Sequence, residues 1–307
     1  MAKHKKIKMR IKNPRKILIL LTILIVVLVS IIIKNNSIKK KENISLIINN
    51  QDITKELNSE IIINENNVFL EFNDIKKCID ENIYLEDNKV ITTSSKKVAI
   101  LEFEKNEIEI NGSKLQIKTR AYKTGEKIYL PISEMQNVYD IEFAYYPEYK
   151  NIVINNYSKK LEKAETKKKL FVKEQAKNSS ANIEKIAKES KVFYVSEENG
   201  WAKIRTQNGN LGYIKKSNLT NFYTEREELQ EETEPKEISY KKDITNKNLD
   251  KYENRKKVID ELLVNAVTDK QQAIKIIYKN EENESYKRFK LESKAILKEC
   301  GITVVFE

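Results

Sequence analysis

The longest mainly apolar stretch of the chain runs from Ile17 to Ile33 and contains no charged residue. A helix over it would be about 25 Å long at ~1.5 Å per residue, near the short end of what crosses a hydrocarbon core. It has no polar face, so we predict a transmembrane helix over residues 17–33. A buried core helix and a cleaved signal peptide are the alternatives, although Lys34, Asn35 and Asn36 do not resemble a cleavage site.

Residues 1–16 form a basic segment that contains eight Lys or Arg side chains and no acid. Positive charge before a membrane helix places the N-terminus in the cytoplasm. We therefore predict a single-pass protein of the cell membrane, with residues 34–307 outside the cytoplasm. Without those eight charges the net charge of +11 falls to +3, which does not supply the basic surface that nucleic-acid binding needs.

Residues 44–157 consist of short β-branched runs that alternate with turn residues, which predicts a β-rich stalk with short helices. The pattern occurs twice with an offset of about 60 residues, as in a repeated supersecondary unit. In the second copy Ile110–Gly112 forms a turn, and Tyr129–Pro131 precedes a short helix. In the first copy Asn50 takes the place of the glycine and Glu71 that of the proline.

These motifs resemble the stalk domain named for the N-terminal region of copper amine oxidases, which is common in extracytoplasmic proteins of Gram-positive bacteria. The resemblance implies a spacer that holds another domain away from the bilayer. It does not imply copper, because the only histidine of the chain is His4. We predict no metal site and no cofactor.

Residues 158–169 are rich in lysine and are predicted to be a linker, and residues 170–222 are predicted to form a second compact β unit. Asn208-Gly209 is typical of a two-residue hairpin turn. The segment Asn199-Gly200-Trp201 and the later Gly212-Tyr213-Ile214 resemble a bacterial SH3-like domain. That resemblance implies binding to peptidoglycan or an envelope protein, with Tyr194, Trp201 and Tyr213 as the ligand-binding candidates because flat aromatic faces stack on sugar rings or peptides. The alternative reading of Trp201 is a core residue of the small barrel.

Residues 223–249 carry a run of glutamates and Pro235, and they are predicted to be a polar linker. The pattern beyond residue 250 predicts a helix, a strand, a second helix ending before Gly301, and a closing strand, which together make a βαβ segment.

The segment over residues 250–307 resembles one βα piece of a family 18 glycoside hydrolase of the cell-wall or spore-cortex type. In that family the strand carries four acidic or amide residues, the last of which is the general acid. The matching positions here are Gln272, Lys275, Ile277 and Lys279. None is a carboxylate, and the segment is far shorter than the roughly 250 residues of a closed (β/α)₈ barrel. We therefore predict a remnant without catalytic activity.

Together these patterns predict a multidomain, mainly β protein with a transmembrane helix, a repeated stalk, a small SH3-like barrel and a C-terminal α/β segment. The leading hypothesis is a non-enzymatic, membrane-anchored envelope protein. One alternative is an active hydrolase that uses another carboxylate, such as Glu282. A second is an assembly subunit whose tail docks on an envelope protein, a state that crosslinking through Cys300 would detect.

Overall fold

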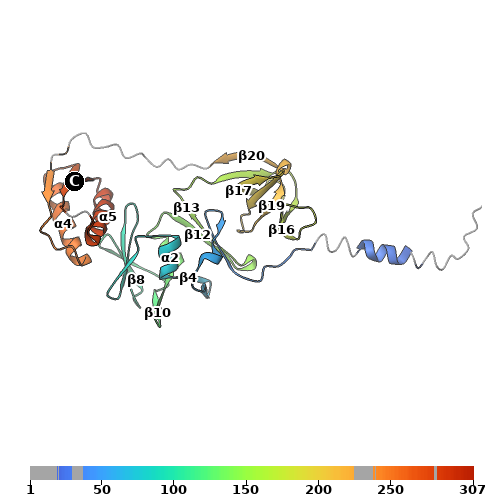
Figure 1. Cartoon of the computed structure of the whole chain (residues 1–307), viewed down its shortest axis with the longest axis horizontal. Helices are drawn as coiled ribbons and strands as arrows, with labels where there is room; N and C mark the ends of the chain where they lie inside the picture. Colours follow the sequence, from blue (N-terminus) through green and yellow to red (C-terminus); the bar gives the residue numbers. More distant parts are fainter. Residues whose placement is uncertain (1–18, 20, 30–36, 225–237, 239, 280–281) are drawn as a thin grey trace, which may run out of the picture. The chain divides into compact units, whose positions relative to one another are not determined.

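The computed structural model describes all of the chain except residues 1–18, 20, 30–36, 225–237, 239 and 280–281 (Figure 1). The chain divides into two units, which are described separately below. The first unit joins residues 1–42 to residues 162–223, and the second joins residues 43–161 to residues 224–307. Their five sheets confirm the prediction of a mainly β multidomain protein.

The predicted membrane span lies only partly within the described residues. Residue 19 and residues 21–29 are helical, and their large apolar side chains are about half exposed, from 59% for Ile19 to 47% for Val29. Among the helices that the structure describes, none has both the length and the apolar character needed to cross a bilayer. The basic segment 1–16 lies outside the described residues, so the anchor and its orientation stay predictions.

The first unit contains one seven-stranded sheet with the order β16-β15-β19-β18-β17-β14-β20. Its core consists mainly of small and β-branched side chains, among them Val172, Ile204 and Ile214. The strands are β14 (Glu162–Thr166), β15 (Leu170–Lys173), β16 (Asn182–Ile186), β17 (Lys191–Glu198), β18 (Trp201–Arg205), β19 (Leu211–Lys215) and β20 (Leu219–Thr224), with a short 3-10 helix η3 (Lys216–Asn218) before the last.

Strand β14 corrects the predicted linker over residues 158–169. It pairs with β17 and buries Ala164 and Thr166, so the second half of that stretch belongs to the sheet. Residues 37–39 also belong to this unit. The backbone N–H of Lys39 donates to the carbonyl of Asn182 on β16 at 2.7 Å, and the Lys39 ammonium pairs with Glu174 at 2.7 Å.

The repeated stalk of the second unit has corresponding elements about 60 residues apart, as the sequence predicts. The first copy contains β1 (Ser45–Ile48), β2 (Gln51–Asp52), η1 (Thr54–Glu56), β3 (Ile62–Asn64), β4 (Asn67–Glu71), α2 (Phe72–Cys78), β5 (Tyr84–Glu86) and β6 (Lys89–Thr93). The second contains β8 (Glu107–Ile110), β9 (Ser113–Gln116), β10 (Tyr122–Thr124), β11 (Lys127–Pro131), α3 (Ile132–Met135), β12 (Ile141–Tyr146), η2 (Pro147–Tyr149) and β13 (Asn151–Asn156).

The two copies exchange strands instead of folding side by side. Strand β4 of the first copy pairs with β11 of the second, and Leu70 lies opposite Leu130, its own counterpart in the repeat. Strand β1 pairs in parallel with β13, so the sheet β12-β13-β1-β2 also contains strands of both copies. A single core, which includes Leu46, Leu70 and Leu130, therefore joins both copies.

An additional strand, β7 (Val98–Glu102), lies between β6 and β8 and completes the five-stranded sheet β5-β6-β7-β8-β9. Side chains alternate between the two faces of a strand. On β7, Ala99 and Leu101 enter the stalk core, whereas Val98 and Ile100 belong to a second core. The outer face of this sheet is therefore apolar and needs a cover.

The C-terminal residues form a three-stranded parallel sheet with two crossover helices. Strand β22 pairs in parallel with both β21 and β23, which confirms the predicted strand–helix–strand order. Strand β21 corrects the predicted linker over residues 223–249, because the α/β module begins at Tyr240. The elements are β21 (Tyr240–Asp243), α4 (Tyr252–Thr268), β22 (Ala273–Ile277), α5 (Glu284–Glu299) and β23 (Thr303–Phe306).

Helices α4 and α5 cover the outer face of the five-stranded stalk sheet (Figure 1). The shared core contains Ile91 and Ile100 from the stalk and Leu262, Phe289 and Leu297 from the helices. The apolar face of the tail is thus occupied within the same chain. The module does not stand free, and its helices do not require a second protein to bury them.

A buried polar cluster lies at the centre of this contact. Arg255 on α4 and Glu292 on α5 have no exposed surface, and Arg255 Nε donates to Glu292 Oε2 at 2.8 Å. The hydroxyl of Tyr84 on β5 donates to Glu292 Oε1 at 2.6 Å. Arg255 Nη1 also donates to the carbonyl of Leu249 at 2.9 Å. Every charged group is therefore partnered, as burial of an ion pair requires.

Candidate functional site

The candidate binding surface of the first unit is built on the hairpins β17-β18-β19. A two-residue turn joins β17 to β18, and its residues Asn199 and Gly200 have φ values of +50° and +73°. The predicted two-residue turn at Asn208-Gly209 is wrong. Those residues lie in a longer loop, which the backbone hydrogen bond from Thr206 to the carbonyl of Asn210 closes at 2.9 Å.

Gly212 on β19 is required by close packing. A Cβ at this position would lie 2.6 Å from side-chain carbons of both Val172 and Ile183, and 2.7 Å from the carbonyl oxygen of Lys173. Strand β15 can therefore approach β19 only where no side chain intervenes. The glycine fixes the position of its neighbour Tyr213 in the candidate surface.

Two of the three predicted aromatic residues share one face of the sheet. Trp201 lies opposite Lys215, and Tyr213 lies opposite Lys203. Because residues two apart on a strand point to the same side, these four side chains lie on one face, while Ala202, Ile204 and Ile214 point into the core.

The sequence reading missed Lys203 and Lys215, although the spacing of 201 with 203 and of 213 with 215 is the signal that would have identified them. The Lys215 ammonium lies 4.1 Å from the centre of the Trp201 ring, a cation–π contact. Trp201 is only 6% exposed, and Tyr213 is half-buried. Tyr213 therefore offers the more accessible ring, and Trp201 supports the lysine.

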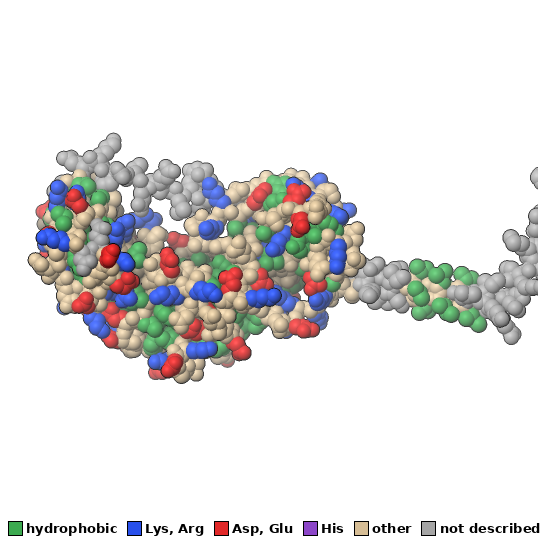
Figure 2. Space-filling view, in the orientation of Figure 1, with side chains coloured by type: hydrophobic (Ala, Val, Ile, Leu, Met, Phe, Trp, Pro, Cys, Tyr) green, Lys and Arg blue, Asp and Glu red, His purple; other side chains and the backbone are tan. Residues whose placement is uncertain are grey.

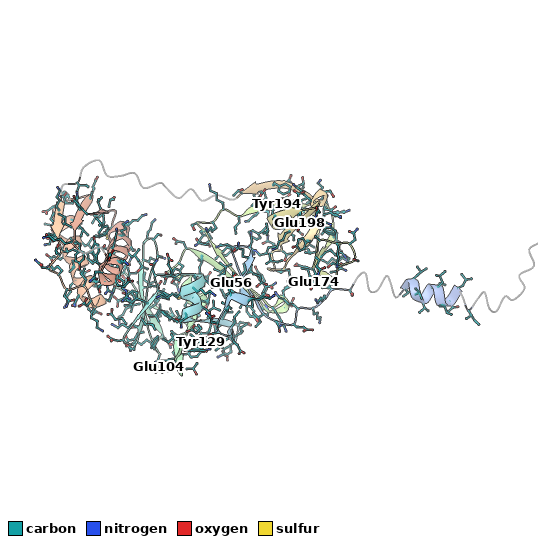
Figure 3. All side chains as sticks on the ribbon, in the orientation of Figure 1. Glu56, Glu104, Tyr129, Glu174, Tyr194 and Glu198 are labelled. Carbon is teal, nitrogen blue, oxygen red and sulfur yellow. The ribbon has the colours of Figure 1, made fainter. Side chains whose placement is uncertain are left out.

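Tyr194 is not part of this face. It lies on β17 (Figure 3), opposite Ile204. Its ring packs against the core and meets the Phe222 ring edge-on at 5.3 Å between centroids. The structure therefore separates Tyr194 from the other two predicted site residues. It is better explained as a core residue.

Ion pairs and buried polar groups surround this surface. Lys216 pairs with Glu197, and this hydrogen bond raises the pKa of the lysine above its ordinary value. On the opposite side of the unit, the buried carboxylate of Glu184 accepts from the amides of Asn208 at 2.7 Å and Asn210 at 2.9 Å. These bonds fix the 206–210 loop. Figure 2 shows acidic and basic side chains interspersed over the face of the described residues that it presents.

Comparison with known proteins identifies this unit. Residues 168–220 match the bacterial SH3 domain. No curated protein matches the chain. The match confirms the SH3-like part of the prediction, and it extends from just before β15 to the first residues of β20. It does not extend to the stalk or to the C-terminal module, so the resemblances to the amine oxidase stalk and to a family 18 hydrolase have no support.

The four positions compared with hydrolase residues lie on or beside β22. Lys275 and Ile277 share the face of β22 that points away from Ile274 and Ile276, which enter the core. The Lys275 ammonium pairs with Glu307 Oε2 at 2.5 Å. Gln272 and Lys279 are exposed at either end of the strand. Glu282, beyond the end of β22, is exposed.

In the part of the chain that the structure describes, no group of three or more His, Cys, Asp or Glu side chains is arranged to hold a metal ion. The two cysteines are free thiols, with Cys300 exposed and Cys78 half-buried. Burial raises the pKa of the Cys78 thiol, which disfavours the thiolate that binds metals.

Proposed function

We propose that this protein is a membrane-anchored, non-catalytic component of a bacterial cell envelope, and that its SH3 domain binds peptidoglycan or an envelope protein. The observation that carries the proposal is the bacterial SH3 match over residues 168–220, because such domains often bind cell-wall peptidoglycan. The uncharged run over residues 17–33 behind a basic segment supports the anchor.

The surface of Trp201, Lys203, Tyr213 and Lys215 is the proposed binding face. A half-buried tyrosine offers a flat apolar ring to a sugar or a peptide stem. The two lysines supply positive charge for the carboxylates that peptide stems carry. Aromatic and cationic groups on one face therefore suit an acidic, partly apolar ligand.

The hydrogen bonds of residues 37–39 tie the SH3 domain to the part of the chain that follows the proposed anchor. Ser37 accepts from the amide of Asn182 at 3.1 Å, and four residue steps separate it from Ile33. Four extended residues span at most about 14 Å. We therefore infer that the SH3 domain meets its ligand near the outer surface of the bilayer. A stalk that acts as a spacer for this domain is not required.

Binding to purified cell wall tests the proposal. The full chain, solubilised in a mild detergent, is mixed with sedimented wall, and the bound fraction is measured. We expect the Lys203→Glu/Lys215→Glu variant to lose about tenfold in affinity, since about 1.4 kcal/mol of lost interaction corresponds to a factor of ten. Tyr213→Ala is expected to reduce binding similarly.

The matched control is Lys188→Glu, an exposed lysine of the same domain that lies outside this face. It carries the same charge reversal and should keep the affinity of the unaltered protein. Equal binding by all variants would contradict the assignment of the face. If the unaltered protein does not sediment with wall, peptidoglycan is excluded as the ligand.

Extraction of membranes tests the anchor separately. The full chain should stay in the membrane fraction at alkaline pH, whereas a variant without residues 17–33 should be released. Release of the full chain under these conditions would exclude a spanning helix. That result would not bear on the binding face proposed for the SH3 domain.

The proposal that the C-terminal module is not a hydrolase rests on β22. Lys275 occupies one compared position and is neutralised by Glu307, and Ile277 has no group that could bind or transfer a proton. We expect a chitin oligomer to remain intact after prolonged incubation with the full chain. Release of product that Glu282→Gln abolishes would refute this.

A further inference from the structure

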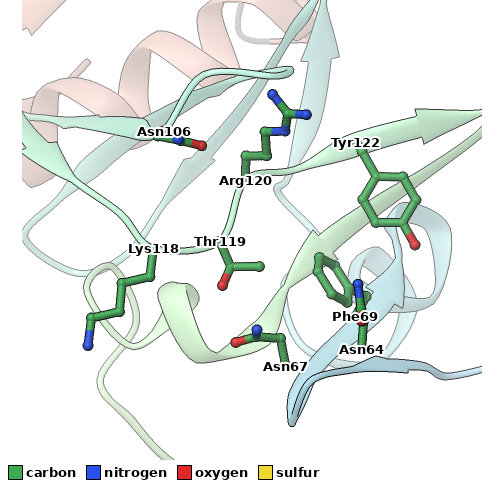
Figure 4. Close-up of a pocket in the computed structure, with 8 residues that line it drawn as sticks. All are labelled: Asn64, Asn67, Phe69, Asn106, Lys118, Thr119, Arg120 and Tyr122. Atoms are coloured by element: carbon green, nitrogen blue, oxygen red, sulfur yellow. The ribbon is translucent and has the colours of Figure 1, made fainter.

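A polar cavity of about 370 Å³ opens beside the stalk sheet β10-β11-β4-β3, far in sequence from the SH3 domain (Figure 4). It combines two aromatic rings, three amides, one hydroxyl and two cations. No carboxylate is among the eight side chains that line it, which belong to Asn64, Asn67, Phe69, Asn106, Lys118, Thr119, Arg120 and Tyr122.

The polar wall of the cavity is held by backbone contacts. Asn64 and Asn67 form the last pair of the β3–β4 hairpin. On the other side, Glu134 of α3 accepts from the backbone N–H groups of Lys118 at 3.1 Å and Thr119 at 3.2 Å. The segment that carries the cations is therefore positioned without any ligand, which reduces the entropy that binding would cost.

The aromatic wall is equally fixed. The Tyr122 ring lies 5.2 Å from that of Phe69, edge to face, and 5.6 Å from that of Tyr129, stacked. Phe69 and Tyr129 are each only 5% exposed, while Tyr122 is half-buried. Tyr122 is therefore the ring with surface left for a ligand.

The polar groups of the cavity retain unused hydrogen-bonding capacity. Within the described residues, the side-chain amides of Asn64, Asn67 and Asn106 make no hydrogen bond to protein, and neither does the Lys118 ammonium. Arg120 uses Nη1 to donate to the carbonyl of Glu104 at 3.2 Å. A guanidinium has five N–H donors, so the remaining ones are available to a ligand.

The first copy of the repeat shows that the fold does not need these groups. There the backbone N–H groups of Asn58 and Ser59 donate to Asp74 at 2.7 and 3.0 Å, as those of Lys118 and Thr119 do to Glu134. The framework is the same, yet Glu60 stands where the second copy has Arg120, and Ile62 where it has Tyr122. Positive charge and the exposed ring are thus properties of one copy only.

We propose that this cavity binds an acidic sugar, a residue of a glycan that carries a carboxylate. The sugar ring would pack on Tyr122, its hydroxyl groups would bond to the asparagine amides, and its carboxylate would pair with Arg120, whereas the Lys118 ammonium points away from that ring (Figure 4). Aromatic faces suit the apolar side of a pyranose, and the fork of an arginine suits a carboxylate. The site is independent of the SH3 face and of the function proposed for it.

Calorimetric titration of the full chain tests the site with two probes of equal length. One is a tetrasaccharide of alternating N-acetylglucosamine and glucuronate, and the other is the neutral N-acetylglucosamine tetramer. We expect the acidic probe to bind at least about tenfold more tightly, and more weakly as salt is raised. Arg120→Ala and Tyr122→Ala should each lower the affinity for the acidic probe by about tenfold or more.

The internal repeat provides matched controls, because Glu60→Ala and Ile62→Ala change the equivalent positions of the first copy. These variants should keep the affinity, as should Lys188→Glu in the SH3 domain, and circular dichroism should report native folding for all of them. Equal binding of the two probes, binding of neither, or unchanged affinity in Arg120→Ala would each overturn the proposal.

Discussion

At the scale of single residues, the stability of the second unit depends on the buried cluster of Arg255, Glu292 and Tyr84. It lies between the α/β module and the stalk, and both charged side chains are fully enclosed. Burial raises the pKa of Glu292, although Arg255 and Tyr84 oppose this by bonding to the carboxylate. The cluster is stable only while all of its members are present, because an unpaired buried charge is costly.

We predict that Arg255→Met lowers the free energy of unfolding of the second unit by about 3–5 kcal/mol, because it leaves Glu292 buried without its cation. The double variant Arg255→Met/Glu292→Leu should lose less unfolding free energy than the two single variants lose in sum. Urea unfolding followed by circular dichroism measures both. The matched control is Lys256→Met on the same helix, whose partially exposed pair with Asp260 contributes about 0.3–0.5 kcal/mol. Strict additivity of the two changes would contradict this account.

Tyr84 makes the stability of the second unit sensitive to alkali. Burial, reinforced by the neighbouring Glu292, raises the pKa of its hydroxyl well above the ordinary value. An unfolded tyrosine ionises near pH 10, so the proton is lost first from the unfolded chain. The stabilisation is therefore complete below about pH 10 and is lost as the pH rises further, by roughly 1.4 kcal/mol per pH unit for one proton.

Tyr84→Phe should flatten this part of the pH profile, while lowering stability at neutral pH because the bond to Glu292 is lost. Urea unfolding between pH 9 and pH 11 measures the slope. Tyr157→Phe, at a tyrosine that is 56% exposed, should keep the slope of the unaltered protein. Identical slopes for the Tyr84 variant and the unaltered protein would refute the role of this hydroxyl.

At the scale of elements, local sequence patterns predicted the turns and helices, but they did not predict which strands pair with each other. The turns at Asn50 and Gly112, the helix end at Gly301 and both C-terminal helices follow from local residue preferences, and each lies where the sequence places it. Strand exchange between the two copies could not be predicted, because the choice of partner depends on contacts distant in the sequence. The parallel pair β1–β13 is the clearest case.

The two strands that the sequence did not predict bury few large apolar side chains. Strand β14 buries only Ala164 and Thr166, which are small. Strand β21 lies at the edge of its sheet and has two lysines, as edge strands often do. In the candidate site, the alternation of strand side chains places Lys203 on the face of Trp201 and Lys215 on that of Tyr213. The register that brings the two pairs together depends on the 206–210 loop, and the packing of Tyr194 on the core depends on the distant Phe222.

Helix α5 explains why the tail cannot be separated from the stalk. Its buried residues are spread around the helix, from Tyr286 to Leu297, because one side meets β23 and another meets β6 and β7. A specific protease site introduced between residues 225 and 237 would leave these contacts intact. We predict that the two fragments stay together in gel filtration after cleavage.

The same cleaved protein with Ile100→Asp should dissociate, because a carboxylate would then enter the apolar contact without a partner. Leu85→Asp is the control, since Leu85 lies on the neighbouring strand β5 but is 40% exposed. Separation of the fragments without any substitution would show that the linking segment, and not the shared core, holds the module.

At the scale of the whole molecule, the SH3 domain is inserted into a unit that surrounds it in the sequence. The second unit consists of residues 43–161 and 224–307, and its two cores contain no residue from the stretch between them. The insertion brings the anchor-proximal residues 37–39 and the SH3 sheet into one unit. The stalk and the α/β module together form the other, which carries the cavity proposed to bind an acidic sugar.

This organisation predicts that the second unit folds without the SH3 domain. Residues 162–223 can be replaced by a flexible Gly/Ser linker of about 20 residues, whose mean span is on the order of 25 Å. The melting temperature of the second unit, followed by its tyrosine signal, should stay within about 3 °C of its value in the unaltered protein, because a loss of 1 kcal/mol shifts the melting temperature of a domain of this size by roughly 2–4 °C.

The only tryptophan of the chain, Trp201, lies in the replaced domain, so tryptophan fluorescence of the unaltered protein reports the first unit alone. A loss of stability as large as that expected for Arg255→Met would mean that the SH3 domain is part of the same cooperative structure, and that the two units do not fold independently.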